Sequence, residues 1–395
     1  MKHISFMKHL LCSVTVVLLG IVSFSACQKS EAPYYAHTEQ DRDSDVITGD
    51  DYEYQLPVIF HVFYQNAQDT LQYVKYNRLK ELIAHVNEIY KGSVYIYAGY
   101  DQSVDMHVNF VLAEEDENNQ RLAQAGVEYV KWTGSWPVDC QTFMGDNKKT
   151  YTKYVWDPNE YINVMVYPFK EDDDDTTVTL GISVTPYQGD GYPELEGLTS
   201  IKQATLSKTN LKFAYCLSIN SNYIYNETSR YKGLSSQTET YNDVAADANA
   251  TLAHELGHYL GLHHVFAEKN SKRLESCDDT DYCTDTKSYN RVAYETWLQA
   301  YVKEKQQETE PSKRFLSVAE MIKRSNDSGD SWNSVNLMDY NVDLNFQFTD
   351  QQRQRIRQVL YYSPLIPGPK KERPSSRAAG AASEGELNLP FTLMK

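Results

Sequence analysis

The segment from His254 to His264 has the residue types and the spacing of a catalytic metal site. His254 and His258 are four residues apart, so on a helix both imidazoles project from one face. Gly261 can adopt a left-handed conformation that ends this helix and returns His264 toward the same point as a third ligand. Three neutral imidazoles leave a zinc ion one open coordination position, as catalytic zinc sites do.

Glu255 follows the first of these histidines and is expected to act as the general base. Its carboxylate lies beside the ion and can take a proton from a zinc-bound water, while the metal lowers the pKa of that water toward about 7 and polarises a scissile carbonyl. His263 competes with His264 as third ligand, but the spacing favours His264. His263 is then expected to be exposed or to lie behind the ligands.

Chance is a poor explanation for this pattern. A short His-Glu-x-x-His alone is ambiguous, because it also occurs on ordinary surface helices. With 10 histidines in 395 residues, the full set of three histidines, one glutamate and one glycine at these offsets has an expectation on the order of 10⁻⁵ per chain.

Composition supports a globular chain and argues against nucleic-acid partners. The chain has 41% hydrophobic and 23% charged residues, and its formal net charge is -16. That charge repels phosphate backbones and anionic lipid headgroups. The length allows two or three domains or one large domain with a cleft.

The first residues are expected to direct export. Lys2 and Lys8 precede an apolar run that is too short to span a bilayer, which is the layout of a signal peptide over residues 1–26. Residues 24–27, Phe-Ser-Ala-Cys, resemble a bacterial lipobox, with Phe24 where Leu is usual. Acylated Cys27 would then anchor the protein to the bacterial cell envelope, at the outer membrane or the cell surface.

Four cysteines remain in the exported part. We expect disulfides in an oxidising compartment, with Cys277 joined to Cys283 and Cys140 to Cys216. Free buried thiols are the alternative.

Hydrophobic periodicity predicts a mixed α/β architecture. An acidic spacer over residues 27–55 precedes a folded body over 56–362, and Pro-rich residues 363–395 are expected to be mostly disordered. The body is expected to contain strands at 56–63, 106–113, 161–167, 180–186 and 213–219, and helices at 79–89, 242–261, 292–305 and from Thr349 onward.

Several separated motifs together resemble one family. The segment His254-Glu255-x-x-His258-x-x-Gly261-x-x-His264 looks like the metzincin zinc signature, and residues 336–340, Asn-Leu-Met-Asp-Tyr, look like its Met-turn. Within that clan the pappalysin, or cytophagalysin, family is the most similar. Its pattern recurs in residues 180–186, in Asp-Thr at 285–286 and in Phe-Thr-x-x-Gln at 348–352. With the lipobox, the chain resembles the zinc-metalloproteinase lipoproteins of gut bacteria.

The resemblance implies a metalloendopeptidase that binds peptide or protein substrates in a cleft. An upper subdomain, about 56–261, would hold a twisted sheet with backing and active-site helices. A smaller irregular or helical subdomain, about 262–362, would lie below. Met338 would form the floor under the zinc, and Tyr340 would hydrogen-bond the oxyanion of the tetrahedral intermediate, although packing is its plain alternative. The substrate would add to an edge strand formed by Leu180, Gly181, Ile182 and Ser183.

The resemblance also raises the question of structural calcium. Acidic residues crowd the region where the family binds calcium, at Asp278, Asp279, Asp281 and Asp285. The family's usual Gly-Asp opening is absent there, so a solvated acidic loop is the competing interpretation. Two other functions remain open: a surface-binding lipoprotein with a retained zinc site, and a metzincin of the fragilysin or adamalysin type. Intact Glu255 argues against the first, and residues 339–340 and 348–352 argue against the second.

Overall fold

A computed structural model describes residues 52–94, 99–171, 178–190, 192–228, 230–231, 246–340, 342–368 and 385–395. The expected signal peptide, Cys27 and most of the acidic spacer lie outside these residues. Export, acylation of Cys27 and the role of residues 27–55 as a spacer therefore stay predictions. Among the helices of the described residues, none is long and apolar enough to cross a membrane.

A mixed sheet forms the centre of the fold and confirms the predicted α/β class. Its strand order is β13-β5-β8-β4-β1-β2. Strand β3 pairs with Phe60–Tyr64 of β1, after the residues of β1 that pair with β2. Strand β1 is parallel to β2, β3 and β4, and β4 is parallel to β8, whereas β5 is antiparallel to β8. The strands are β1 Tyr54–Tyr64, β2 Val108–Leu112, β3 Val127–Lys131, β4 Ile162–Tyr167, β5 Gly181–Val184, β8 Leu217–Asn220 and β13 Leu393–Met394.

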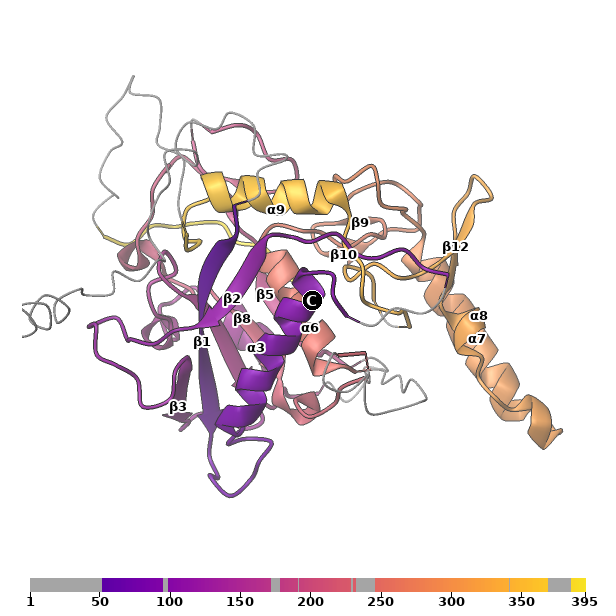
Figure 1. Cartoon of the computed structure of the whole chain (residues 1–395), viewed down its shortest axis with the longest axis horizontal. Coiled ribbons are helices and arrows are strands. Elements are labelled where there is room, and N and C mark those ends of the chain that lie inside the picture. Colours follow the sequence, from indigo (N-terminus) through magenta and orange to yellow (C-terminus); the bar gives the residue numbers. More distant parts are fainter. Residues whose placement is uncertain are drawn as a thin grey trace, which may run out of the picture. The chain divides into compact units, whose positions relative to one another are not determined.

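Two long helices pack together on the same side of this sheet (Figure 1). Helix α3, Tyr76–Tyr90, lies against β2, and helix α6, Ala248–Tyr259, lies against β5 and β8. Outside this layer are helices α4 Cys140–Gly145, α7 Arg291–Gln307, α8 Val318–Met321 and α9 Asp350–Tyr362. The 3₁₀ turns are η2 Thr152–Tyr154, η3 Lys208–Asn210, η4 Ser221–Tyr223 and η5 Pro311–Lys313. The short strands are β6 Tyr187–Gln188, β7 Thr199–Ser200, β9 Glu268–Lys269, β10 Lys272–Arg273, β11 Lys323–Ser325 and β12 Ser331–Asn333.

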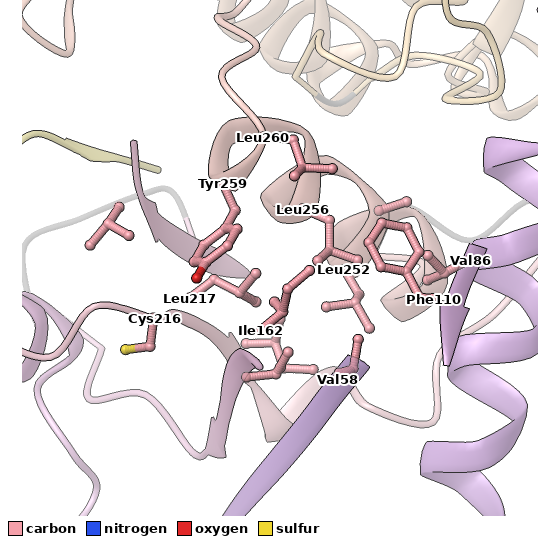
Figure 2. Packing of buried hydrophobic residues seen from close by; sticks show 14 of the residues in the cluster. Val58, Val86, Phe110, Ile162, Cys216, Leu217, Leu252, Leu256, Tyr259 and Leu260 are labelled. Carbon is pink, nitrogen blue, oxygen red and sulfur yellow. The ribbon is translucent and has the colours of Figure 1, made fainter. Parts of the chain in front are cut away.

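The apolar stripe of α6 packs its helix onto the sheet (Figure 2). Leu252 and Leu256 have no exposed surface, and they point toward Val58 of β1 and Leu217 of β8, which are also fully buried. Burying a side chain of this size contributes about 1.5–3 kcal/mol. The opposite face of α6, which carries the histidines, is therefore held at a set height above the sheet.

Both ends of α6 have a local cause. Asp247 caps the N-terminus, since its side chain accepts hydrogen bonds from the amides of Asn249 and Ala250. The helix thus begins at Ala248, later than the predicted residue 242. At the other end Gly261 has φ +92°, the left-handed conformation that glycine adopts at little cost.

The predicted disorder of residues 363–395 is wrong for the part that the structure describes. Residues 385–395 lie along the sheet, and β13 pairs with β5. Apolar side chains at every second position, Leu387, Leu389, Phe391 and Leu393, pack against the core. This period of two is typical of a half-buried strand, and the proline-rich composition around it concealed the signal.

The predicted disulfides are also absent from the described residues. Cys140, Cys216, Cys277 and Cys283 are all free thiols, and three of them are buried. The sulfur of Cys216 lies 3.4 Å from the thioether of Met144, so it packs as a small apolar group in the core.

Candidate active site

Helix α6 and the turn after it bring the three predicted imidazoles to one point. The Nε2 atoms of His254 and His258 are 3.0 Å apart, those of His258 and His264 are 3.0 Å apart, and those of His254 and His264 are 3.3 Å apart. A tetrahedral zinc ion with Zn–N bonds of about 2.0–2.1 Å requires nitrogen separations of about 3.3 Å. The spacing therefore fits one small metal ion.

The outer nitrogens of the rings show which form of the imidazoles is present. The Nδ1 atoms of His254 and His258 lie 2.7 and 2.8 Å from the carbonyl oxygens of Leu337 and Leu262. Carbonyls only accept, so both Nδ1 atoms carry the proton and both Nε2 atoms present lone pairs. Burial and the neighbouring His264 lower the pKa of His254 to about 3, which keeps this ring neutral.

Lone pairs that face one another at about 3 Å repel unless a cation lies between them. Within the described residues, His254, His258 and His264 are the only group of three or more histidine, cysteine or acidic side chains whose ligand atoms converge. The donor set thus fits a divalent metal of the zinc type.

Glu268 is a site residue that the sequence analysis missed. Its Oε2 atom lies 3.0 Å from Nδ1 of His264 and orients that ring, as carboxylates commonly do for metal-binding histidines. Burial alone would raise the pKa of Glu268, but His264 and His263 lower it. The available signal was its position, four residues after His264.

His263 packs behind the ligands, and the alternative that it is exposed is wrong. Its side chain is 13% exposed, and Nδ1 lies 4.0 Å from Oε1 of Glu268. The ring meets the edge of Tyr282 at 5.3 Å. His264, and not His263, therefore joins the other two imidazoles.

Glu255 is buried beside the histidines, and its Oε2 atom has no hydrogen-bond partner among the described residues. Burial raises the pKa of Glu255 well above its ordinary value. The carboxylate fits here because residue 181 of β5 is glycine: a Cβ at Gly181 would come within 2.5 Å of the Cγ and Oε1 atoms of Glu255. Strand β5 and the glutamate are thus in direct contact.

The predicted Met-turn lies directly beneath α6. A Cβ at Gly257 would come within 2.6 Å of the sulfur of Met338, so the glycine allows the turn to approach the helix. The carbonyl of Leu337 accepts from His254, and the carbonyl of Met338 accepts from the amide of Val265. The turn therefore supports two of the segments that carry the converging histidines.

Tyr340 stands beside the imidazoles with its hydroxyl at the cavity. Its ring centroid is 4.5 Å from that of His264 and 4.8 Å from that of Phe266. Burial, with the nearby charges of Glu268 and Glu255, raises the pKa of Tyr340 far above its ordinary value. The hydroxyl therefore keeps its proton near neutral pH and can donate a hydrogen bond.

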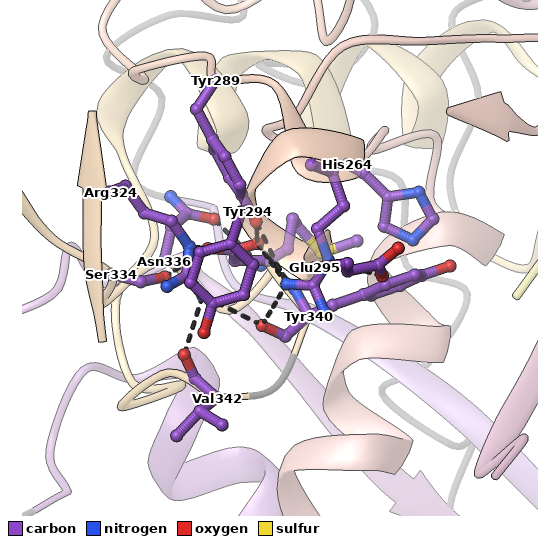
Figure 3. A network of polar contacts seen from close by, with 12 residues as sticks. His264, Tyr289, Tyr294, Glu295, Arg324, Ser334, Asn336, Tyr340 and Val342 are labelled. Carbon is purple, nitrogen blue, oxygen red and sulfur yellow. Dashed lines mark hydrogen bonds and ion pairs between the residues drawn. The ribbon is translucent and has the colours of Figure 1, made fainter. Parts of the chain in front are cut away.

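Buried charges hold the backbone of Tyr340 in place (Figure 3). Guanidinium groups of Arg291 and Arg324 donate to its carbonyl oxygen at 3.1 and 3.3 Å. The same groups face Asp339, with Arg324 Nε 3.1 Å and Arg291 Nη1 3.8 Å from its oxygens. Figure 3 shows Arg324 and Ser334 on one side of this network and His264 on the other. The network fixes Tyr340 relative to the histidines.

A cavity of about 470 Å³ opens next to these groups. Its lining includes the catalytic candidates Glu255 and Tyr340 and the predicted edge-strand residues Leu180 and Gly181. His254, Glu295 and Lys395 also line it. Glu295 is paired with Arg273 and Arg291. Glu255 is therefore the carboxylate of this set that is left for acid–base chemistry.

The structure gives intrachain hydrogen bonds to three of the four acids predicted to bind calcium, and the carboxylate of Asp278 accepts from the hydroxyl of Ser276 at 2.9 Å. Asp281 accepts from the amide of Cys283 at 3.0 Å and from the hydroxyl of Thr286 at 2.8 Å. Asp285 accepts from Thr349 and Gln351 at the start of α9, while Asp278 and Asp279 are exposed. Calcium binding stays a prediction, and metal analysis of the purified protein before and after chelation decides it.

Comparison with known families supports a peptidase. Residues 230–361 match the peptidase family described as Pregnancy-associated plasma protein-A. The matched segment contains the three histidines, Glu255, the Met-turn and Tyr340. The match confirms the resemblance to the pappalysin family and supports a metalloendopeptidase. No curated protein sequence matches the chain.

Similar solved structures come from Tannerella forsythia. Mature mirolysin in complex with a cleaved peptide is 18% identical, with a TM-score of 0.46, 77% of this chain covered and 90% of that chain covered. A promirolysin mutant is 15% identical, with a TM-score of 0.46 and coverages of 81% and 84%. Mirolysin in complex with a compound is 14% identical, with a TM-score of 0.41 and coverages of 78% and 91%.

Replacing His264 should remove the metal, whereas replacing its neighbour should not. We expect His264→Ala to weaken zinc binding by at least about 100-fold, because two nitrogens remain where three converged. His263→Ala, the matched control, should retain one zinc per chain. Metal titration with a chromogenic chelator measures both variants, and loss of zinc in His263→Ala with retention in His264→Ala would contradict the assignment.

Asp339 should stabilise the fold only while it is ionised. Burial raises the pKa of Asp339, but the charges of Arg324 and Arg291 together lower it by more than burial raises it. The net shift of the pKa is downward. The stabilisation is therefore complete above the unfolded pKa of about 3.9 and disappears as the pH falls through the lower folded value. We expect Asp339→Asn to cost about 3–5 kcal/mol near pH 7, because buried Arg324 loses its carboxylate partner and Arg291 is left with Glu295.

Urea unfolding at a series of pH values tests this expectation. The stability gap between wild type and Asp339→Asn should shrink below about pH 4. Exposed Asp327 is the control site, where Asp327→Asn should change stability by less than about 0.5 kcal/mol. A gap that stays constant down to pH 2 would show that the charge of Asp339 is not what stabilises the Met-turn.

Proposed function

We propose that this protein is an exported, lipid-anchored zinc endopeptidase that hydrolyses peptide bonds with a water molecule activated by Glu255. The observation that carries the proposal is the convergence of three imidazole nitrogens beside the buried carboxylate of Glu255, whose Oε2 atom has no partner among the described residues. A catalytic zinc site has three protein ligands and one open position for water, with a base beside it. A structural zinc site has four protein ligands and needs no neighbouring carboxylate.

His254, His258 and His264 would hold the metal through Nε2. When bound, zinc would supply Lewis acidity, which polarises the scissile carbonyl and makes water more acidic. Leu337, Leu262 and Glu268 hold the three Nδ1 atoms, which keeps the Nε2 atoms turned toward the position of the metal.

Glu255 is suited to transfer protons at this point. As general base it would take a proton from the attacking water, and it could then deliver that proton to the leaving amine. Its raised pKa makes it a stronger base than an exposed glutamate. The contact with Gly181 restricts where the carboxylate can move, so the proton is held close to strand β5.

Tyr340 is suited to stabilise the negative charge that develops on the carbonyl oxygen. Its protonated hydroxyl is a donor, and Arg291 and Arg324 hold its backbone. A pre-positioned donor of this kind is worth about 2.7–4 kcal/mol in the transition state. Strand β5 would bind the substrate backbone in extended form, which makes recognition largely independent of side chains.

Changing Glu255 to glutamine tests the proton-transfer role with little change in shape. We expect Glu255→Gln to lower kcat for a quenched fluorescent peptide by about 10²–10⁴-fold while one zinc per chain remains bound. Glu295→Gln is the matched control, because Glu295 lines the same cavity but is already paired with arginines. It should retain activity within about tenfold of wild type. Wild-type turnover by Glu255→Gln would contradict the proposed mechanism.

Lipid attachment at Cys27 is tested in cells. We expect the full chain to incorporate labelled palmitate and to fractionate with membranes, whereas Cys27→Ala should lose both properties. Cys12→Ala, within the expected signal peptide, should keep the label. Palmitate incorporation by Cys27→Ala at the wild-type level would contradict the anchor.

A further inference from the structure

Residues 385–395 follow an extended path that leads to the candidate active site. The amide of Leu387 donates to Asn210 at 3.0 Å, and the ring of Phe391 stacks on Phe213 at 4.5 Å. Further along, the hydroxyl of Tyr187 donates to the carbonyl of Pro390 at 2.6 Å. The segment thus reaches β5 already in extended form.

Strand β13 then lies on the edge of β5 that faces away from β8. Leu393 pairs with Val184 and Met394 pairs with Ser183 in antiparallel register. Just before the strand, the amide of Thr185 donates to Thr392. This is the edge predicted to receive substrate, so the backbone groups that a peptide would use are occupied by the protein's own chain.

The segment also reaches the reacting groups. Its direction is opposite to that of β5, so it runs from Val184 toward Gly181, the residue in contact with Glu255. The hydroxyl of Tyr340 donates to the main-chain carbonyl oxygen of Lys395. Lys395 lines the same cavity as Glu255 and His254. Its carbonyl therefore accepts the hydrogen bond that the proposed mechanism assigns to a scissile carbonyl.

We propose that residues 385–395 are an internal substrate mimic, which occupies the peptide-binding edge of β5 on the N-terminal side of the cleavage position. Leu393, Met394 and Lys395 stand where the last three residues before the cut would lie. A peptide substrate and this segment cannot occupy the edge together, so the segment restrains activity until it is displaced. This inference rests on the proposed peptidase function.

The contacts of the segment are weak enough for displacement to be feasible. Met394 is buried, but Lys395 is exposed and residues 391–393 are only partly buried. The ion pair between Lys149 and Glu386 is exposed on both sides, so solvent and salt screen it strongly. Each hydrogen bond of the segment is replaced by one to water when the segment leaves, so its net contribution is small. Attachment to the same chain raises the effective concentration of the segment to the millimolar range, which offsets this weakness.

Substitution of Met394 in the full chain tests the restraint. Met394→Asp puts a charge where the side chain is buried, so it should release the segment and raise kcat/KM for a short peptide on the order of tenfold. The rise should come from a lower KM, because the catalytic groups are unchanged. Met394→Leu conserves the volume and should retain wild-type kcat/KM. Loss of stability in Met394→Asp without a rise in kcat/KM would make the segment purely structural and overturn the proposal.

Binding of the segment in trans gives a readout that does not need turnover. A fluorescein-labelled peptide with the sequence of residues 387–395 should bind the full-length Glu255→Gln/Met394→Asp chain, in which the internal segment is released. It should bind at least tenfold more weakly to the full-length Glu255→Gln chain that keeps Met394, and a peptide with Met394→Asp should bind neither. Equal binding to both chains, or no binding to the Met394→Asp chain, overturns the proposal.

These two experiments separate the inference from the proposed function. If no variant hydrolyses any peptide, the binding comparison still shows whether the β5 edge accepts this segment. If hydrolysis occurs but kcat/KM is the same in wild type and Met394→Asp, the peptidase proposal stands and the substrate mimic falls.

Discussion

Mutual repulsion among three imidazole nitrogens is the constraint on which the rest of the structure depends. The Nε2 atoms of His254, His258 and His264 face one another at 3.0–3.3 Å, and backbone carbonyls hold the protons of His254 and His258 on Nδ1. Such an arrangement is stable only with a cation at its centre, and it exists because surrounding groups oppose any rotation of the rings. Leu337 and Glu268 come from outside α6, so the tertiary fold supplies part of this opposition.

Close approach of backbone segments is the second requirement of the site. Two glycines allow it, since Gly181 leaves room for Glu255 and Gly257 leaves room for Met338. An added methyl group at either position would come within about 2.6 Å of its neighbour, much closer than van der Waals contact. The sheet, helix α6 and the Met-turn therefore pack closely because the glycines at these two contacts have no side chain.

Strand β5 connects the architecture to recognition. It pairs with β8 on one edge and with β13 on the other, and it touches the carboxylate of Glu255 through Gly181. Backbone pairing does not depend on side-chain identity, so one edge can accept an external peptide or an internal segment. Competition for that edge follows from its geometry and does not require a separate regulatory domain.

The sequence by itself determined which three histidines converge, the glutamate beside them and the helix that carries them, because helical spacing places His254 and His258 on one face and Gly261 permits the return to His264. Tertiary structure decided what spacing cannot encode. It selected thiols over disulfides, placed Glu268 behind His264, and brought residues 385–395 to a strand two hundred positions earlier in the chain. Local patterns constrain neighbours within a few residues, whereas pairing between distant segments depends on which surfaces the packed core leaves adjacent.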